Sequence, residues 1–132
     1  MTLRKFKSFM LFWAICFLVV GAYFVFLPNQ VIDTLNHAAR FLKMGGPISL
    51  TQDYLWLSLA GSMMMTISYL SYALFQDPKN HHLMNALLVS KCMSSCFFSF
   101  FALKINSTYW LGTLVDFPIF ILFLWTFRKI RT

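Results

Sequence analysis

Residues 83–103, LMNALLVSKCMSSCFFSFFAL, are long and apolar enough to cross a bilayer but include one charge, Lys91. A second apolar stretch, residues 109–127, contains one charge of opposite sign, Asp116. A charged side chain near the bilayer centre costs at least about 2.5 kcal/mol, so such residues usually face the protein interior and have partners. The sequence therefore predicts that Lys91 and Asp116 form a partnered, inward-facing site.

The composition of the chain is that of a polytopic membrane protein. Of its 132 residues, 59% are hydrophobic and only 11% are charged, against roughly 25% charged residues in soluble domains. The net charge of +7 would suggest nucleic acid on a soluble surface, but here most cations adjoin the ends of apolar runs. We therefore expect the lipid bilayer, and no nucleic acid, as a partner.

Four apolar runs have the length of a membrane span. At about 1.5 Å of rise per residue, 19 to 22 residues match a hydrocarbon thickness of roughly 30 Å. Because lipid leaves no backbone group unpaired and the runs are too long for barrel strands, each must be a helix. The predicted fold is one all-α transmembrane domain over residues 1–132, with spans at 8–27, 54–75, 83–103 and 109–127.

Lysine and arginine in the flanks indicate the orientation. One side carries Arg4, Lys5, Lys7, Lys79, Arg128, Lys129 and Arg131, and the other carries only Arg40, Lys43 and Lys104. The positive-inside rule then places both termini in the cytoplasm, and an even number of spans requires that the termini share a side. We expect a multi-pass membrane protein with both termini in the cytoplasm.

The first span has a rival interpretation as a cleaved signal peptide. Basic residues precede it, and Val20, Gly21 and Ala22 resemble a small-residue cleavage site. However, its apolar core of about 20 residues exceeds the 7 to 15 that are typical of a signal peptide, and it ends at Pro28. We expect an uncleaved anchor.

The long connection between the first two spans, residues 28–53, contains an amphipathic pattern. Apolar residues recur at spacings of four, three and four, at Val31, Leu35, Ala38 and Leu42, with Asp33, Asn36, Arg40 and Lys43 between them. This predicts a short helix, about residues 29–43, that lies flat on the outer leaflet. Asn29 is expected to cap it, and residues 45–47 to end it. Ser49 and Gln52 then form a capping box for the second span.

The two other connections, residues 76–82 and 104–108, are short. Short connections produce antiparallel neighbours, so we expect a tight hairpin of the third and fourth spans, with the first two spans linked loosely. Polar side chains accompany the charges in this hairpin. Helical spacing places Ser94, Ser95 and Ser99 beside Lys91, and Thr113 on the side of Asp116.

Lys91 lies about 18 Å and Asp116 about 10 Å from the outer ends of their spans, a difference of about 8 Å that a lysine and one water or serine can bridge. The candidate ligand-binding residues are Lys91, Asp116, Ser94, Ser95, Ser99 and Thr113. They form either a site for an ion, a proton or an anionic head group, or a fixed ion pair that locks the hairpin. The sequence leaves both interpretations open.

The second span carries a heptad-like seam. Its members are Ser58, Ser62, Met65, Tyr69 and Tyr72, with Gly61 beside them. Small residues allow close helix approach, and we favour packing inside the bundle over a dimer interface.

No metal or cofactor site is expected. Cys16, Cys92 and Cys96 lie inside apolar runs and lack metal-ligand spacing, His81 and His82 are assigned to the cytoplasmic loop, and His37 to the outer helix. No catalytic set is expected either, apart from a serine near Lys91.

The chain resembles a group of small uncharacterised four-span bacterial membrane proteins. The resemblance lies in residues 21–28, residues 56–59 with Met63 and Met64, Ser90 and Lys91 with Ser94 and Ser95, and Gly112 with Asp116. It implies a four-helix inner-membrane protein in which the lysine and aspartate belong to the motif, and it implies no activity. In outline the chain is also similar to DoxX-type proteins, in size and span count.

Three functions are compatible with these patterns. The first is a non-enzymatic accessory or interaction subunit that packs against other membrane helices or forms a homo-oligomer. The second is a transporter or ligand-binding protein that uses Lys91 and Asp116. The third is a lipid- or quinone-linked enzyme, which would need Ser90, Ser94 or Ser95 as a nucleophile. We favour the first.

Overall fold

The computed structural model describes residues 1–48 and 55–131, and it is helical over most of them. Its elements are α1 (Leu3–Phe26), α2 (Pro28–Phe41), α3 (Leu55–Gln76), α4 (His81–Lys104), the short 3₁₀ helix η1 (Ser107–Tyr109) and α5 (Trp110–Arg131). By length and composition, four of the described helices can cross a membrane. The four predicted spans are thus confirmed, with boundaries that differ by a few residues.

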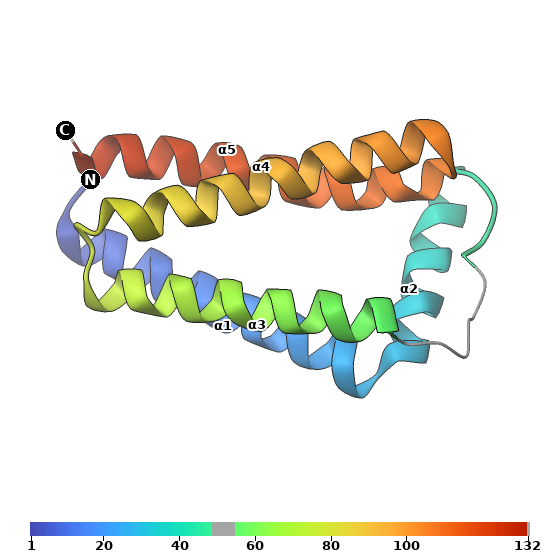
Figure 1. Ribbon diagram of the computed structural model, residues 1–132, viewed down its shortest axis with the longest axis horizontal. Coiled ribbons are helices and arrows are strands. Elements are labelled where there is room, and N and C mark those ends of the chain that lie inside the picture. Colours follow the sequence, from blue (N-terminus) through green and yellow to red (C-terminus); the bar gives the residue numbers. More distant parts are fainter. Residues whose placement is uncertain (49–54, 132) are drawn as a thin grey trace.

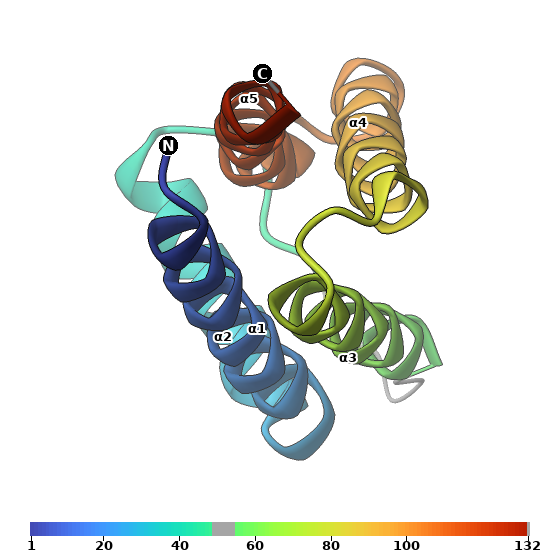
Figure 2. The same cartoon turned by 90° about the vertical axis from the view of Figure 1, so that its left-hand side faces the viewer.

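The long helices form two antiparallel pairs, α1 with α3 and α4 with α5 (Figures 1 and 2). The most extensive contact joins α1 and α3, although the connection between them is the longest in the chain. The link between the first two spans is long, as predicted, and the two helices nevertheless pack closely against each other. Both termini lie at the same end of the bundle, as an even number of spans requires (Figure 1).

The contact between α1 and α3 depends on residues with little or no side chain. A Cβ atom on Gly61 would lie 2.5 Å from Val25 Cγ2 and 3.2 Å from the carbonyl oxygen of Gly21. Further along, the buried Ser68 hydroxyl donates to the carbonyl oxygen of Ala14 at 2.6 Å. Close backbone approach and an interhelical hydrogen bond are the interactions that hold helices together in lipid.

The seam predicted for this helix is shifted by one residue. Ser58, Ser62, Tyr69 and Tyr72 are exposed, and Met65 is half-buried. The buried face instead contains Leu57, Gly61, Ser68 and Ser71. The prediction that the polar seam packs inside the bundle was wrong because the tight approach to α1 selects Gly61 for the contact and turns its polar neighbours outward.

Aromatic side chains pack α1 against α5 and so join the two pairs. The ring centroids of Phe6 and Phe127 lie 6.0 Å apart, and Phe123 lies 5.5 Å from Trp13 and 5.9 Å from Phe9. These rings belong to the main apolar core, to which α3 and α4 contribute Leu74 and Leu87. The core therefore lies between the pairs.

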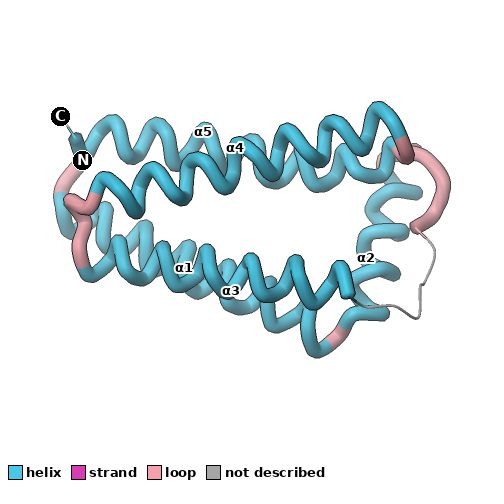
Figure 3. The backbone as a smooth tube through the Cα atoms, in the orientation of Figure 1, coloured by secondary structure: helices cyan, strands magenta, loops and turns pink. Residues whose placement is uncertain are grey.

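Helix α2 lies across the end of the bundle where α1 ends (Figure 3). Its buried residues Val31 and Ile32 pack with Leu57 of α3. Pro28 is the first helical residue and Leu27 the N-cap, so the prediction that Asn29 caps the helix was wrong. Proline suits this position because its missing N–H would have no helical partner there.

The end of α2 also differs from the prediction. The helix stops at Phe41, and Lys43 takes a left-handed conformation with φ of 52°, while the N–H of Met44 donates to the carbonyl of Ala39 at 2.9 Å. This is the hydrogen bond of a Schellman cap. Lys43, rather than the glycines and proline at 45–47, therefore ends the helix.

Two loops at this end are fastened by asparagines. Asn36 exchanges two hydrogen bonds with the backbone of Ile48, and Asn106 donates to the carbonyl of Gly46 at 3.0 Å. The predicted capping box of Ser49 and Gln52 lies outside the described residues.

Both histidines assigned to the cytoplasmic loop begin a helix. His81 and His82 are exposed in the first turn of α4, where Asn80 is the N-cap and accepts a hydrogen bond from the N–H of Leu83. The loop is therefore shorter than predicted.

Candidate functional site

The charged residues of α4 and α5 meet between the helices. Lys91 Nζ lies 2.7 Å from Asp116 Oδ1 and donates a hydrogen bond to it. Lys91 is 1% exposed and Asp116 is 3% exposed. The two side chains thus point into the protein, and the offset of about 8 Å estimated along the helix axes is spanned by the lysine side chain alone.

Ser94, on the same side of α4 as Lys91, is the second hydrogen-bond partner of the carboxylate. The hydroxyl of Ser94 donates to Asp116 Oδ2, so both carboxylate oxygens accept a hydrogen bond from α4. A buried carboxylate is tolerated when its charge is paired and its oxygens are hydrogen-bonded. Ser94 therefore belongs to the site, as its spacing from Lys91 predicted.

The lysine also contacts the other helix pair. Its Nζ lies 4.7 Å from the ring centroid of Phe17 on α1, in the geometry of a cation–π interaction. Phe17 in turn stacks on Trp13, with centroids 5.4 Å apart. Sequence reasoning missed Phe17 because its place beneath Lys91 depends on how α1 packs against α4 and α5, and no local pattern encodes that contact.

The remaining candidate residues lie next to the pair but do not contact the ammonium or the carboxylate. Ser99 of α4 and Thr113 of α5 share a hydrogen bond at 3.1 Å, which forms a second polar contact between these helices. Ser95 is buried, but its hydroxyl donates to the carbonyl of Lys91 in its own helix at 2.8 Å. The six predicted residues thus divide into a central triplet, a second interhelical contact and one intrahelical bond.

A glycine one helical turn before Asp116 allows α5 to approach α4. A Cβ atom on Gly112 would lie 2.5 Å from the ring of Phe98. The ring occupies the space that a side chain at position 112 would need. This close approach keeps the separation of Lys91 and Asp116 within hydrogen-bond range.

The site is a closed, electrically neutral centre. Lys91 pairs with the carboxylate, and both carboxylate oxygens already accept a hydrogen bond. Among the described residues, no three or more His, Cys, Asp or Glu side chains lie together so that they could hold a metal ion. The geometry is that of a direct contact between α4 and α5.

No family of known proteins, no curated protein and no solved structure matches this chain.

Proposed function

We propose that this chain is a non-enzymatic integral membrane protein that acts as an accessory or interaction subunit. The observation that carries the proposal is the direct, buried contact between Lys91 and Asp116, with Ser94 on the second carboxylate oxygen. A centre whose charges satisfy each other inside the protein fits a structural lock. Because Lys91 also contacts Phe17, this lock joins α4 and α5 to α1.

The outward face of α3 supports a role in protein contacts. Ser58, Ser62 and Tyr72 are exposed there, and Tyr69 is 68% exposed. Hydroxyl groups on a lipid-facing helix can donate and accept hydrogen bonds with a neighbouring transmembrane helix. This face is suited to contact another membrane protein or a second copy of the chain.

We place the protein in the bacterial inner membrane with both termini in the cytoplasm, and the distribution of cations supports this orientation. The end of the bundle that holds the termini also holds Lys79, and the opposite end carries Arg40, Lys43 and Lys104. In this orientation α2 lies on the outer leaflet. Its charged residues Asp33 and Arg40 are exposed, whereas Val31 and Ile32 are buried against α1 and α3, so the helix lies on the end of the bundle.

A double-mutant cycle tests the structural lock. Lys91→Met and Asp116→Leu should each destabilise the protein by about 3 kcal/mol, because each leaves one buried charge without its partner. The double variant should lie within about 1 kcal/mol of the wild type, since no buried charge is left over. The free energy of unfolding is measured in detergent micelles by denaturant titration followed by circular dichroism, with Lys104→Met, an exposed lysine of the same helix, as the control.

The same proteins test the interaction role. In mild detergent extracts of native membranes, the wild type and the double variant should migrate in an assembly larger than the 15.4 kDa chain. A wild-type chain that migrates alone contradicts an accessory role. If the double variant loses as much free energy of unfolding as the two single variants together, the structural lock is contradicted.

Transport is the second candidate, because the contact between Ser99 and Thr113 extends the polar groups from the ion pair toward the outer end of the helices. Proteoliposomes that contain folded wild-type protein should show no more proton or ion flux than empty vesicles. Flux that disappears in the Asp116→Leu variant would favour transport over the lock.

A further inference from the structure

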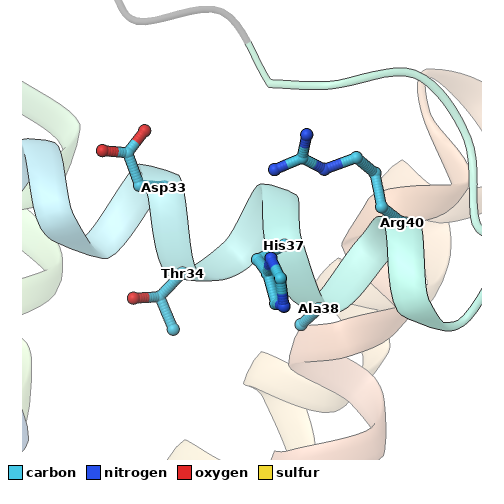
Figure 4. Close-up of a pocket in the computed structure, with 5 residues that line it drawn as sticks. All are labelled: Asp33, Thr34, His37, Ala38 and Arg40. Atoms are coloured by element: carbon cyan, nitrogen blue, oxygen red, sulfur yellow. The ribbon is translucent and has the colours of Figure 1, made fainter.

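Outside the Lys91–Asp116 site, charged groups of both signs lie on α2, around a wide-open surface cavity of about 500 Å³ lined by Asp33, Thr34, His37, Ala38 and Arg40 (Figure 4). Asp33, His37 and Arg40 follow one another at spacings of four and three residues, which places them on one face of the helix. All three are exposed. The cavity therefore presents one acid, one base and an imidazole to whatever occupies it.

The two charges are held apart along the helix. Asp33 and Arg40 are seven positions apart in the sequence, which corresponds to about 10.5 Å along the helix axis. In Figure 4 both side chains project to the same side of α2, and the guanidinium of Arg40 reaches back toward Asp33. Within the described part of the chain, neither residue forms an ion pair. Opposite charges are thus arranged around a space rather than against each other.

Thr34 holds α2 in place through two hydrogen bonds. Its hydroxyl donates to the carbonyl of Gln30 at 2.7 Å and shares a hydrogen bond with the hydroxyl of Tyr23 on α1 at 3.0 Å. These bonds fix the first half of α2 against α1. The cavity wall is therefore tied to the transmembrane bundle, and the charged groups keep their positions relative to it.

We propose that this cavity binds a zwitterionic phosphate–amine group of the phosphoethanolamine type, with Arg40 and His37 on the phosphate and Asp33 on the ammonium. A guanidinium is the preferred partner of phosphate oxygens, and a carboxylate accepts hydrogen bonds from an ammonium group. The cavity has one charge of each sign, so a ligand with one charge of each sign complements it better than an anion. The proposal is independent of the function assigned to Lys91 and Asp116.

Such a group can come from a phospholipid or from a soluble compound. The position of α2 at the end of α1, where a transmembrane helix leaves the bilayer, is the depth of lipid head groups. Phe41, next to Arg40, is 81% exposed, so an apolar surface for an acyl chain adjoins the phosphate-binding end of the cavity. The experiment below separates the two sources.

The test is native mass spectrometry of the full-length protein in detergent with three phospholipids that have the same acyl chains. Phosphatidylethanolamine should bind about fivefold more tightly than phosphatidylcholine, whose quaternary ammonium has no N–H to donate to Asp33. Phosphatidylethanolamine should also bind about fivefold more tightly than phosphatidylglycerol, which has no ammonium group to contact Asp33. If the wild type binds the three lipids equally, the proposal is overturned. This test needs no variant protein.

Variants of the cavity test which residue binds the ammonium and which binds the phosphate of the ligand. Asp33→Asn should reduce binding of phosphatidylethanolamine to the level of phosphatidylcholine and leave the latter unchanged, whereas Arg40→Gln should weaken binding of all three lipids. Asp77→Asn and Lys104→Gln remove one charge of each sign outside the cavity and should have no effect. If Asp33→Asn behaves like Asp77→Asn, the ammonium is not bound as proposed.

Competition identifies the source. Soluble phosphoethanolamine that displaces phosphatidylethanolamine at comparable concentration assigns the cavity to a soluble zwitterion. Retention of the lipid under those conditions assigns it to the membrane, with Phe41 as the acyl contact, and Phe41→Ser should then lower lipid affinity.

Discussion

At the scale of single residues, the carboxylate of Asp116 depends on two donors that lie one turn apart on α4. Lys91 supplies charge and Ser94 supplies a hydroxyl, each to a different oxygen. Ser95, the next residue, directs its hydroxyl to its own helix instead. Two neighbouring serines of the same stripe therefore have different energetic roles.

This difference predicts unequal effects of the same substitution. Ser94→Ala should lower the free energy of unfolding by about 1.5 kcal/mol, because one oxygen of a buried carboxylate loses its donor. Ser95→Ala should cost less than about 0.5 kcal/mol, since the carbonyl of Lys91 is also a helix acceptor. Denaturant titration in micelles measures both, and equal losses would show that the hydroxyl of Ser94 does not support the carboxylate.

The sequence was sufficient to predict which residues of α4 and α5 meet at this site. It could not predict the direction of each hydroxyl or the contact from α1. The cost of a charge in lipid is large, so Lys91 and Asp116 had to face inward, and helical spacing placed Ser94 beside them. Spacing cannot show which way a hydroxyl rotates, so Ser94 and Ser95 were indistinguishable. Phe17 lies on another helix, and its contact with Lys91 arises only from the tertiary packing.

At the scale of helices, the packing of α1 on α3 is decided by glycines rather than by the polar pattern. The heptad of hydroxyl and tyrosine residues is regular, but it faces outward, while Gly61 approaches the backbone of Gly21. Periodicity identifies a face, and it does not say which face is covered by protein. Gly61 indicated a close approach from the sequence, but only the structure shows that its face, and not the polar seam, packs on α1.

This geometry predicts that bulk at position 61 separates the helices. Gly61→Leu should destabilise the protein by about 2 kcal/mol, because its Cβ alone would overlap Val25 and press on the Gly21 carbonyl. Ser62→Leu adds a comparable side chain to the exposed neighbour and should change the free energy of unfolding by less than about 0.5 kcal/mol. Thermal unfolding followed by circular dichroism compares them, and similar midpoints would contradict the packing.

At the scale of the whole molecule, two helix pairs are joined by an aromatic core and by the contact of Lys91 with Phe17. The number of spans and the shared end of the termini follow from run lengths and from the parity of the spans, so the sequence was sufficient for both. The pairing of α1 with α3 through a long connection was not predictable in detail, because loop length limits packing only when loops are short.

The positive-inside rule predicts how the whole bundle is inserted. In a chain with Cys16, Cys92 and Cys96 replaced by alanine, Lys104→Cys should react with a membrane-impermeant maleimide in intact bacterial cells, because it lies at the end with fewer cations. Lys79→Cys, at the end of the bundle that holds the termini, should react only after the membrane is opened. Thr2→Cys serves as the matched control and should follow Lys79→Cys, since four spans place the N-terminus and this loop on one side. The reverse pattern would show that the cations do not set the orientation, and opposite labelling of positions 2 and 79 would contradict the four-span topology itself.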